Sequence, residues 1–546
     1  MLNYCIMDCY VDEPACFGVP PFISPYPRYL FGALIDAGVN ESRIEYITID
    51  ALRESDYRLG TAYELVLLIG GAAVPGRYLG SAIGTMAEIK RIIGRNHEQR
   101  FAVGGLISRI LPGAPNAVLV HNDIEKYAHQ FVRSAPLDGR RSVEEIARWA
   151  VSGAAVVRLH PRFPDVICEV ETYRGCPRES HCSFCVEGLF GPVIYREIRD
   201  IIAEIDALID NGVSRFRLGR QADILEYQSD CTVFRKGFPK PAVTPIRELL
   251  AELRERKNRG LVRILNIDNA NPGTIANFPE EASRILEELV STITPGDTIA
   301  LGVESFDDTV VRLNNLKATA AEAETAIEII NQIGGIRVDS VPCLLPGVNL
   351  IHGLAGETIS TFATNYRRLS EIMDRGLLLK RINIRRLLPF PGTPLYGRRL
   401  RASKAIENRF AYYREKIRTE IEHTMLQRIY PIGMIVRENQ ILEIRAGYSY
   451  GKQIASYSIT SKFPLPLQER QFYDAVVIGH RERSIITLPY PIDINSLPRN
   501  AVVRIPGIGK KRAVDIIMKR PFTDIAEARD LLAGVNRDIV NKMTAQ

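Results

Sequence analysis

The stretch Gly175-Cys-Pro-Arg-Glu-Ser-His-Cys-Ser-Phe-Cys185 carries three cysteines in one short segment. Cys182 and Cys185 are separated by two residues, and Cys176 lies upstream of them across a gap of five. Soft thiolate ligands at close spacing suit an iron–sulfur or a zinc site. A [4Fe–4S] cluster has four irons, so three protein thiolates leave one iron open to another ligand. The segment therefore predicts a [4Fe–4S] cluster held by Cys176, Cys182 and Cys185, with one iron available for chemistry.

A zinc site is the main alternative for these thiols. A closed zinc site uses four ligands, usually as two close pairs, and the sequence has no second Cys-x-x-Cys motif or histidine pair. Cys168 lies eight residues before Cys176, and His181 directly precedes Cys182, so neither forms a natural second pair. We favour the iron–sulfur interpretation, with zinc and inert buried thiols as alternatives.

The composition is that of a large soluble enzyme. The chain has 546 residues, of which 46% are hydrophobic and 25% charged, and this length suggests three or four domains. The N-terminus lacks the basic and apolar pattern of a signal peptide, and no apolar run approaches the roughly 20 residues that span a bilayer. The nine cysteines are clustered rather than spread as a disulfide framework. We therefore expect a cytoplasmic protein with no membrane partner.

The middle of the chain alternates between strand and helix patterns. Helices are expected from residue 198 and near 245–256, 280–292 and 322–333, and strands at 165–173, 213–219, 261–268, 298–304, 348–353 and 382–388. Strands that alternate with helices imply a parallel sheet with right-handed crossovers. We predict an α/β fold in which residues 160–400 form a barrel or part of one.

Polar residues follow several of these strands. In such barrels the reactive groups collect where the strands end. Asp268 and Asn269 follow the third predicted strand, and Glu304 and Ser305 follow the fourth. Cys343 lies in a predicted insertion before the fifth strand, where a buried thiol is the simpler interpretation. Asp268, Asn269 and Cys343 are our candidates for contacting the substrate.

Four ordered motifs between residues 164 and 398 resemble those of radical S-adenosylmethionine (SAM) enzymes. They are Glu171-Thr-Tyr-Arg-Gly-Cys-Pro177 with Phe184 before the last cysteine, Leu301-Gly-Val-Glu-Ser305, Gly353-Leu-Ala-Gly-Glu-Thr358 and Leu388-Pro-Phe-Pro-Gly-Thr-Pro394. The family usually has three residues between the first two cysteines, whereas this chain has five. The resemblance implies a partial (β/α)6 TIM-type barrel in which SAM chelates the open iron and is cleaved to a 5′-deoxyadenosyl radical.

The resemblance also implies roles for single residues. Phe184 packs near the adenine, and Glu304 or Ser305 meets the ribose or the methionine end of SAM. Gly219 and Gln221 belong to the segment Gly219-Arg220-Gln221, which occupies the place of the family's Gly-Gly-Glu segment but matches it poorly. The contact with the SAM amino group is therefore the least defined of these roles.

Residues 1–150 form another alternating unit. Strands are expected at 3–10, 45–49, 65–69, 101–103 and 117–120, and helices at 28–37 and 86–93. This pattern predicts a doubly wound, Rossmann-like sheet. Gly70-Gly71 and Gly104-Gly105 follow two of the strands, where glycine lets the backbone approach a ligand closely, although glycine pairs also simply make turns.

A doubly wound domain before the barrel resembles the cobalamin-binding domain of radical SAM methyltransferases. The Asp-x-His-x-x-Gly signature is absent, so the resemblance implies cobalamin bound without a histidine from that motif. Tyr26, Arg28 and residues 17–21 are expected to border the corrin. The alternative is a second cluster on Cys5, Cys9 and Cys16, as in radical methylthiotransferases, but their close spacing fits buried thiols better. The expected cofactors are therefore the [4Fe–4S] cluster, SAM and cobalamin.

We expect the C-terminal part of the chain to form two modules. Residues 401–498 begin with a helix near 406–427 and continue as a small β-domain. Residues 499–546 hold ten Lys and Arg against five Asp and Glu, and the segment 503–513 resembles a helix-hairpin-helix. Its backbone N–H groups with Lys510, Lys511 and Arg512 would bind a phosphate. Docking against the enzyme itself or a protein partner is the alternative.

The predicted function is a cobalamin-dependent radical SAM C-methyltransferase that receives electrons from a separate donor. The domain order resembles an archaeal group of radical enzymes, which implies a protein substrate, with a glutamine of methyl-coenzyme M reductase as the specific candidate. Two alternatives come from other classes. One is a radical SAM enzyme that methylates or methylthiolates tRNA or DNA, and the other is a non-enzymatic iron–sulfur protein that binds nucleic acid.

Overall fold

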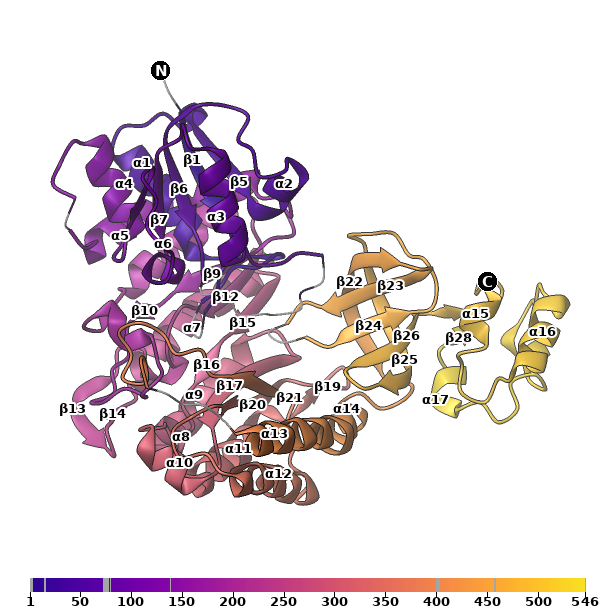
Figure 1. Cartoon of the computed structure of the whole chain (residues 1–546). Helices are drawn as coiled ribbons and strands as arrows, with labels where there is room; N and C mark the ends of the chain where they lie inside the picture. The colour runs from indigo at the N-terminus through magenta and orange to yellow at the C-terminus, as the bar shows by residue number, and fades with distance from the viewer. Residues whose placement is uncertain are drawn as a thin grey trace. The chain divides into compact units, whose positions relative to one another are not determined.

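The computed structural model describes residues 3–13, 16–71, 78, 80–137, 139–398, 403–455 and 458–545. The chain forms two compact units (Figure 1). Unit 1 comprises Met1–Thr292 with Leu388–Arg399, and unit 2 comprises Ile293–Leu387 with Leu400–Gln546. The division falls inside the predicted barrel, so each half is described with its own unit.

The N-terminal sheet of unit 1 is fully parallel. Its strands are β1 (Asn3–Asp8), β5 (Ile44–Thr48), β6 (Tyr63–Ile69), β7 (Phe101–Gly104) and β8 (Ala117–Leu119), in the order β5-β1-β6-β7-β8. Along the chain this order is second, first, third, fourth, fifth, the flavodoxin-like form of a doubly wound sheet. The predicted sheet is confirmed, because long apolar runs such as 65–69 are buried on both faces of a parallel sheet.

Five helices accompany this sheet. They are α1 (Pro25–Asp36), α2 (Ile49–Glu54), α3 (Met86–Arg95), α4 (Ile124–Val132) and α5 (Val143–Ser152), of which α5 packs on α1. Thr85 and Glu88 form a capping box at the start of α3, and Ser142 and Glu145 form one at the start of α5. The apolar face of α3 enters the core of the sheet through Ile89, Ile92 and Ile93.

The strands predicted to form the first half of the barrel make one sheet in unit 1. Its strands β9 (Ile167–Glu171), β12 (Arg215–Gly219) and β15 (Ile264–Ile267) are parallel, with helices α6 (Ile198–Asp210), α7 (Val243–Asn258) and α9 (Pro279–Thr292) between or after them. A short strand, β4 (Phe22–Ile23), pairs with β9 from the N-terminal part of the chain. Residues 22–23 therefore belong to the same sheet as β9, although the predicted boundary between the first two domains lies near residue 150.

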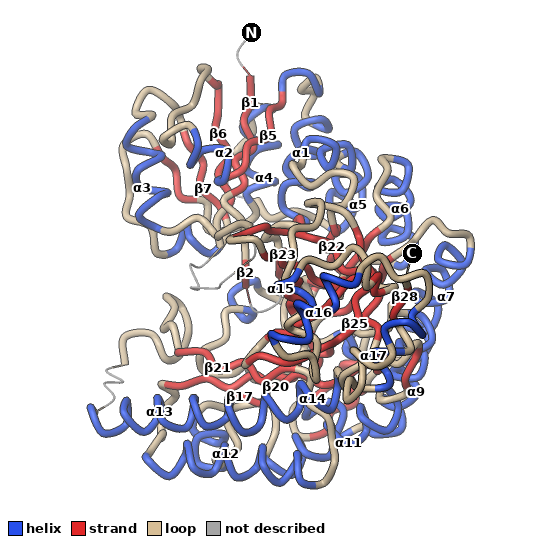
Figure 2. Tube along the Cα trace, turned by 90° about the vertical axis from the view of Figure 1, so that its right-hand side faces the viewer, coloured by secondary structure: helices blue, strands red, loops and turns tan. Residues whose placement is uncertain are grey.

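The strands predicted to form the second half of the barrel make a separate sheet in unit 2. The parallel strands β17 (Asp297–Glu304), β20 (Leu344–His352) and β21 (Arg381–Arg386) are accompanied by α10 (Asp308–Leu313), α11 (Ala320–Gly334) and α12 (Ile359–Asp374). Helix α11 packs on β20, and α12 lies beside α13 (Lys404–Lys416) (Figure 2). All six predicted barrel strands are present. Strand β20 begins four residues earlier than predicted, after the hairpin of β18 (Arg337–Val338) and β19 (Val341–Pro342).

The rest of unit 2 is a closed β-barrel and a C-terminal helical module. Helix α13 continues through a π-helical segment, Ile417–Glu422, into α14 (His423–Ile429). The barrel consists of β22 (Ile435–Arg445), β23 (Tyr448–Gln453), β24 (Thr460–Phe463), β25 (Phe472–Arg481) and β26 (Ser484–Pro489). The C-terminal module holds α15 (Arg499–Val502), α16 (Lys510–Lys519) and α17 (Arg537–Val540), and the strands β27 (Ile492–Asp493) and β28 (Met543–Thr544) pair at its ends.

Within the described part of the chain, no helix is both long and apolar enough to span a membrane.

Candidate functional site

The three cysteines of the predicted cluster share one loop after β9. Short strands β10 (Tyr173–Arg174) and β11 (Ile194–Tyr195) pair at the two ends of this loop. Inside it the backbone N–H of Cys185 donates to the carbonyl of Cys182 at 3.1 Å, which forms a tight turn. Cys182 is buried, whereas Cys176 and Cys185 are partly exposed. The sequence therefore folds into a loop that presents three thiols at the carboxyl end of the first barrel strand.

An arginine and a histidine contact the cysteines of this loop. The guanidinium of Arg178 donates to Sγ of Cys182 at 3.3 Å and stacks over the ring of Phe238 at 4.6 Å. The Nε2 atom of His181 lies 3.2 Å from the backbone carbonyl of Cys176, and its ring packs on Gly188. His181 therefore contacts the cysteine loop through the backbone carbonyl of Cys176.

The three thiols of this loop are the donors expected for the predicted cluster, and their role as its ligands stays a prediction. No group of three His, Cys, Asp or Glu side chains among the described residues could hold one ion. A cubic cluster instead spreads its thiolate ligands over separate irons. The other candidate set, Cys5, Cys9 and Cys16, is completely buried, and burial raises the pKa of each thiol above its usual value. Buried neutral thiols agree with packing in the sheet.

The segment that follows β12, residues 219–221, makes close contacts with neighbouring parts of the protein. A Cβ on Gly219 would lie 2.5 Å from Cδ of Glu169, and the side chain of Gln221 bonds the carbonyl of Leu218 at 3.0 Å. Arg220 is fully buried with a φ of +53°. The segment is therefore held rigidly by protein contacts.

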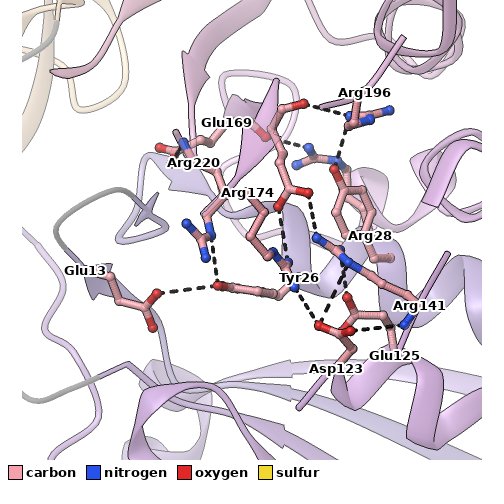
Figure 3. A network of polar contacts seen from close by, with 12 residues as sticks. Glu13, Tyr26, Arg28, Asp123, Glu125, Arg141, Glu169, Arg174, Arg196 and Arg220 are labelled. Carbon is pink, nitrogen blue, oxygen red and sulfur yellow. Dashed lines mark hydrogen bonds and ion pairs between the residues drawn. The ribbon is translucent and has the colours of Figure 1, made fainter. Parts of the chain in front are cut away.

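Arg220 connects three parts of unit 1. Its guanidinium donates to Glu187 in the cluster loop at 3.2 Å. It also donates to the hydroxyl of Tyr26 at 3.2 Å, and that hydroxyl contacts Glu13 at 3.4 Å (Figure 3). Its charge also lies 4.4 Å from the ring centre of Phe190. The residue after the second strand thus ties the cysteine loop to the N-terminal domain.

The third strand contributes an ion pair and an unpartnered amide. Asp268 pairs with Arg217, which also pairs with Glu169 on the first strand. Asn266 faces Arg217 across the sheet and is fully buried. Neither amide atom of Asn266 has a hydrogen-bond partner among the described residues. Since buried amides are rarely left unpaired, Asn266 is a candidate ligand contact that sequence reasoning missed, although an Asn in the apolar run 264–267 was its signal.

Asp268 and Asn269 are less available than predicted. The Asp268 carboxylate is buried against Arg217, and the side chain of Asn269 lies 3.4 Å from that carboxylate. Asp268 therefore acts first as the counter-ion of a buried arginine. A substrate contact by either residue stays a prediction.

In unit 2, Glu304 and Ser305 differ in their availability. Ser305 accepts a hydrogen bond from the N–H of Asp307 at 3.2 Å, which uses it in a turn. Glu304 ends β17 with a φ of +64°, is buried, and has an Oε2 without a partner among the described residues. Burial raises the pKa of Glu304 to about 7 against the opposing charges of Lys317 and Arg385. Of the two, Glu304 is better placed to bind a cationic ligand group.

A prediction follows from the pKa of Glu304. A carboxyl with a raised pKa stabilises the folded state fully below about pH 4.5, and this contribution is lost as the pH rises through 7. Between pH 5 and pH 8, wild type should therefore lose stability relative to Glu304→Gln, by on the order of 3 kcal/mol. Thermal unfolding midpoints at several pH values measure this difference. Glu287→Gln on the exposed face of α9 is the control, and parallel curves for all three proteins would contradict the assignment.

A histidine cluster at the end of β20 was not predicted. His352 is buried, with Nδ1 2.8 Å from Glu357 and Nε2 3.3 Å from Glu407, and it stacks on Phe410 at 4.0 Å. Glu357 also accepts from the N–H of Gly353 at 2.8 Å. The Gly353–Thr358 motif therefore folds as a turn held by this glutamate. Sequence reasoning missed the cluster because Glu407 is 55 residues away from His352.

Cys343 is not placed with these residues. It immediately precedes β20, so it lies at the opposite end of that strand from His352. Its side chain is 2% exposed. Because reactive groups collect where barrel strands end, the prediction that Cys343 contacts the substrate is not supported, and the buried-thiol interpretation accounts for it.

Phe184 lies in the loop between Cys182 and Cys185 and is partly exposed. Its packing near an adenine stays a prediction.

The glycines predicted to bind cobalamin are packed against their own chain. A Cβ on Gly70 would lie 2.8 Å from Ile107, and one on Gly104 would lie 2.5 Å from Ile124. Gly105 has a φ of +79°, and its Cβ would lie 2.4 Å from the carbonyl of Gly70. Gly71 similarly approaches the backbone after β1. These contacts explain the glycines without a ligand, so their role in cofactor binding stays a prediction, and residues 72–77 lie outside the described part.

Buried charges surround the predicted corrin neighbours. Arg28 is fully buried and pairs with Glu204 of α6 at 2.7 Å, and Arg196 pairs with the same carboxylate at 2.5 Å (Figure 3). The guanidinium of Arg28 also donates to the backbone carbonyl of Glu169 at 2.5 Å. The charge of Arg28 is thus already neutralised by Glu204, and its place beside a corrin stays a prediction.

Tyr26 does line a cavity at the carboxyl edge of the N-terminal sheet. The cavity has a volume of about 50 Å³, and its other lining residues include Leu106, Arg109, His121, Arg174 and Phe190. Three polar atoms buried in this neighbourhood have no hydrogen-bond partner among the described residues: Glu13 Oε1, Arg174 Nε and Arg220 Nη2. A corrin carries amide side chains that both donate and accept. These buried polar atoms could pair with such groups, and cobalamin binding at this edge stays a prediction.

Three comparisons place the chain among known proteins. A sequence profile of the radical SAM superfamily matches residues 170–369. The chain is 37% identical over 506 residues to the uncharacterized protein MJ0274 of Methanocaldococcus jannaschii, covering 88% of this chain and 92% of the relative. It is 36% identical over 532 residues to an uncharacterized protein of Archaeoglobus fulgidus, covering 96% of each.

Structural comparison returns partial matches to two solved structures. The methyltransferase TsrM of Kitasatospora setae with cobalamin and a [4Fe–4S] cluster has a TM-score of 0.48 at 14% identity, covering 72% of this chain and 77% of that one. The cobalamin-dependent SAM radical enzyme OxsB, with aqua-cobalamin and SAM bound, has a TM-score of 0.45 at 12% identity, covering 68% of this chain and 52% of that one.

Proposed function

Because the chain belongs to the family of MJ0274 and its Archaeoglobus relative and contains a radical SAM domain, we propose that it is a cobalamin-dependent radical SAM C-methyltransferase. The observation that carries this proposal is the contact of Arg220 with both Glu187 and Tyr26. It joins the three-cysteine loop to the carboxyl edge of a doubly wound sheet. In α/β sheets of this kind, ligands bind at that edge.

The residues of the chain have separate tasks in this proposal. Cys176, Cys182 and Cys185 hold the cluster as thiolates, and Arg178 stabilises the charge on Cys182. Glu304, whose Oε2 has no hydrogen-bond partner among the described residues, is the proposed contact for the cationic end of SAM. When bound, the cluster supplies the electron that cleaves SAM to a radical, and cobalamin carries the methyl group to the substrate carbon. A separate electron donor must therefore act on the protein.

The buried ion pairs exclude water from the cofactor edge. Arg141 pairs with Glu125 at 2.7 Å and with Glu171 at 2.6 Å, while Arg174 pairs with Asp123 at 2.6 Å. All of these side chains are largely buried. Carboxylates and guanidiniums that neutralise each other leave a dry, rigid boundary, and such boundaries protect reactive intermediates from solvent.

We propose a protein as the methyl acceptor, with a glutamine of methyl-coenzyme M reductase as the specific candidate. The order of the doubly wound domain, the variant cysteine loop and the C-terminal module supports this choice. The test incubates reconstituted enzyme, SAM and reductant with a peptide that contains the glutamine. We expect a peptide heavier by one methyl group on a glutamine carbon in mass spectrometry.

The matched control is the same peptide with asparagine in place of glutamine, which should remain unmodified. An unmodified glutamine peptide, in a reaction that does form 5′-deoxyadenosine, would remove the protein substrate from the proposal. The radical chemistry would still stand.

A further inference from the structure

The β-barrel of unit 2 has an order that sequence reasoning did not resolve. Its strands close as β22-β23-β24-β26-β25 (Figure 1). All neighbouring strands are antiparallel except β24 and β26, which are parallel. In chain order this is first, second, third, fifth, fourth, closing on the first. That is the five-stranded Greek-key arrangement of OB-type barrels, which use the face of their second and third strands to bind oligonucleotides.

The second and third strands alternate between the barrel interior and the outer face. Ser449, Ser461 and Phe463 are completely buried inside. Tyr448 and Tyr450 point to the other side and are partly exposed, because successive side chains on a strand face opposite ways. Two tyrosines therefore lie two residues apart on the outer face of β23, at a spacing that places both rings on one surface.

Cations surround both rings. The Nζ atom of Lys462, on β24, lies 4.1 Å from the ring centre of Tyr448 and 5.3 Å from that of Tyr450. The guanidinium of Arg445 lies 5.3 Å from the ring of Tyr450. Burial raises the pKa of Tyr450, but hydrogen bonds and charges from Arg445 and Lys462 outweigh it and lower that pKa overall. One carboxylate, Glu443, shares this face and lies 3.5 Å from Arg445.

The basic C-terminal module continues this surface. Arg504 donates to the hydroxyl of Tyr448 at 3.4 Å. Beyond it, α16 begins at Lys510 and Lys511, which are exposed, and Gly509 caps the helix without a side chain, so the first backbone N–H groups have no side-chain acceptor. Arg512 was predicted to contact a phosphate together with the two lysines. In the structure its guanidinium instead donates to the backbone carbonyls of Gly507 and Ala533 and so connects the two turns of the module.

The module docks on its own barrel through an apolar core. Val476, Ile478 and Leu488 of the barrel share a core with residues of the module such as Val502 and Ile516. This agrees with the alternative that the module docks on its own enzyme. Docking fixes the position of Lys510 and Lys511 relative to the tyrosine face within unit 2, and it leaves these lysines exposed.

We propose that the face formed by Tyr448, Tyr450, Lys462, Arg445 and Arg504 binds single-stranded nucleic acid. Aromatic rings stack on bases of any sequence, and cations beside them follow the phosphate backbone. Lys510 and Lys511 extend the phosphate contacts. The surplus of basic residues in 499–546 gives the surface the charge that a polyanion needs. The surface lies outside the radical site, so this inference goes beyond the proposed function.

The test uses the full chain and a fluorescein-labelled oligouridylate of about 16 nucleotides, the upper range for one barrel of this kind. Fluorescence anisotropy measures the Kd at several salt concentrations. We expect each of Tyr448→Ala and Tyr450→Ala to weaken binding about tenfold, since stacking on one ring contributes a factor of this order. Lys510→Ala and Lys511→Ala should each lower the slope of log K against log salt by about 0.7.

Matched controls separate this surface from general charge and from misfolding. Tyr448→Phe and Tyr450→Phe keep the rings and should bind as wild type. Tyr412→Ala and Lys90→Ala remove an exposed aromatic and an exposed cation elsewhere, and they should also leave the Kd unchanged.

Three outcomes would overturn the inference. One is no binding of the oligouridylate at low salt, and another is equal weakening by the control variants. The third is binding to duplex alone, because stacked and paired bases cannot reach the tyrosine rings. A thermal unfolding midpoint equal to that of wild type confirms that each alanine variant is folded.

Discussion

Replacing Cys176, Cys182 and Cys185 together by alanine is expected to abolish cluster binding and all formation of 5′-deoxyadenosine. The three thiols lie in one loop, and the loop has no neighbouring set of side chains within the described residues that could take over. Iron and sulfide content after anoxic reconstitution should fall to background, and the visible absorbance of the cluster should disappear. Turnover should fall to that of a reaction without enzyme.

The control for this variant is Cys231→Ala. Cys231 is an exposed free thiol on β13 (Asp230–Arg235), outside the cysteine loop. This variant should keep its iron content and its activity. Stoichiometric zinc in place of iron in wild type would contradict the cluster assignment, and so would undiminished iron in the triple variant.

Removing the carboxylate of Glu204 is expected to destabilise unit 1 strongly. Glu204 is fully buried and is the shared acceptor of Arg28, from the N-terminal domain, and Arg196, which follows the cysteine loop. Glu204→Ala leaves two buried guanidiniums without their counter-ion. Breaking a buried ion pair in this way costs about 3 to 5 kcal/mol. The thermal unfolding midpoint of the variant should fall by several degrees.

An exposed glutamate gives the matched comparison. Glu287→Ala removes a carboxylate from the solvent side of α9, and surface substitutions of this kind change stability by about 0.5 kcal/mol or less. If Glu204→Ala lowers the midpoint no more than Glu287→Ala does, the buried network does not hold the N-terminal domain to the barrel half.

Much of the fold could be predicted because parallel strands leave a clear pattern. The run 65–69 and the run 298–304 are buried on both faces, so each is continuously apolar or small and ends in glycine or a polar residue. The helices between them carry one apolar stripe each. Strand and helix positions along the chain were therefore predictable, and so was a doubly wound sheet, whereas the order of its strands comes from the structure.

Other features of the fold depend on contacts between distant parts of the chain, and no local sequence pattern indicates them. Strand β4 has two residues and exists only because β9 pairs with it. His352 meets Glu407 only after the chain has folded back. Closure of the β-barrel rests on the parallel pairing of β24 with β26, which are short strands of mixed composition.

The candidate site was predicted best where chemistry requires fixed spacing. The three cysteines lie in one loop because neighbouring irons of a cluster need neighbouring thiolates. Arg220 and Asn266 were harder, because an arginine after a strand and an asparagine inside one are common. Only their complete burial, with polar atoms left unpartnered, marks them.

The most direct test measures what becomes of SAM whose methyl group carries deuterium. Anoxic protein loaded with iron, sulfide and cobalamin is mixed with this SAM, a strong reductant and substrate. The account predicts 5′-deoxyadenosine and S-adenosylhomocysteine in equal amounts, with the deuterated methyl group recovered on a carbon of the product. Formation of S-adenosylhomocysteine without 5′-deoxyadenosine, or turnover that is unchanged without cobalamin, would contradict it.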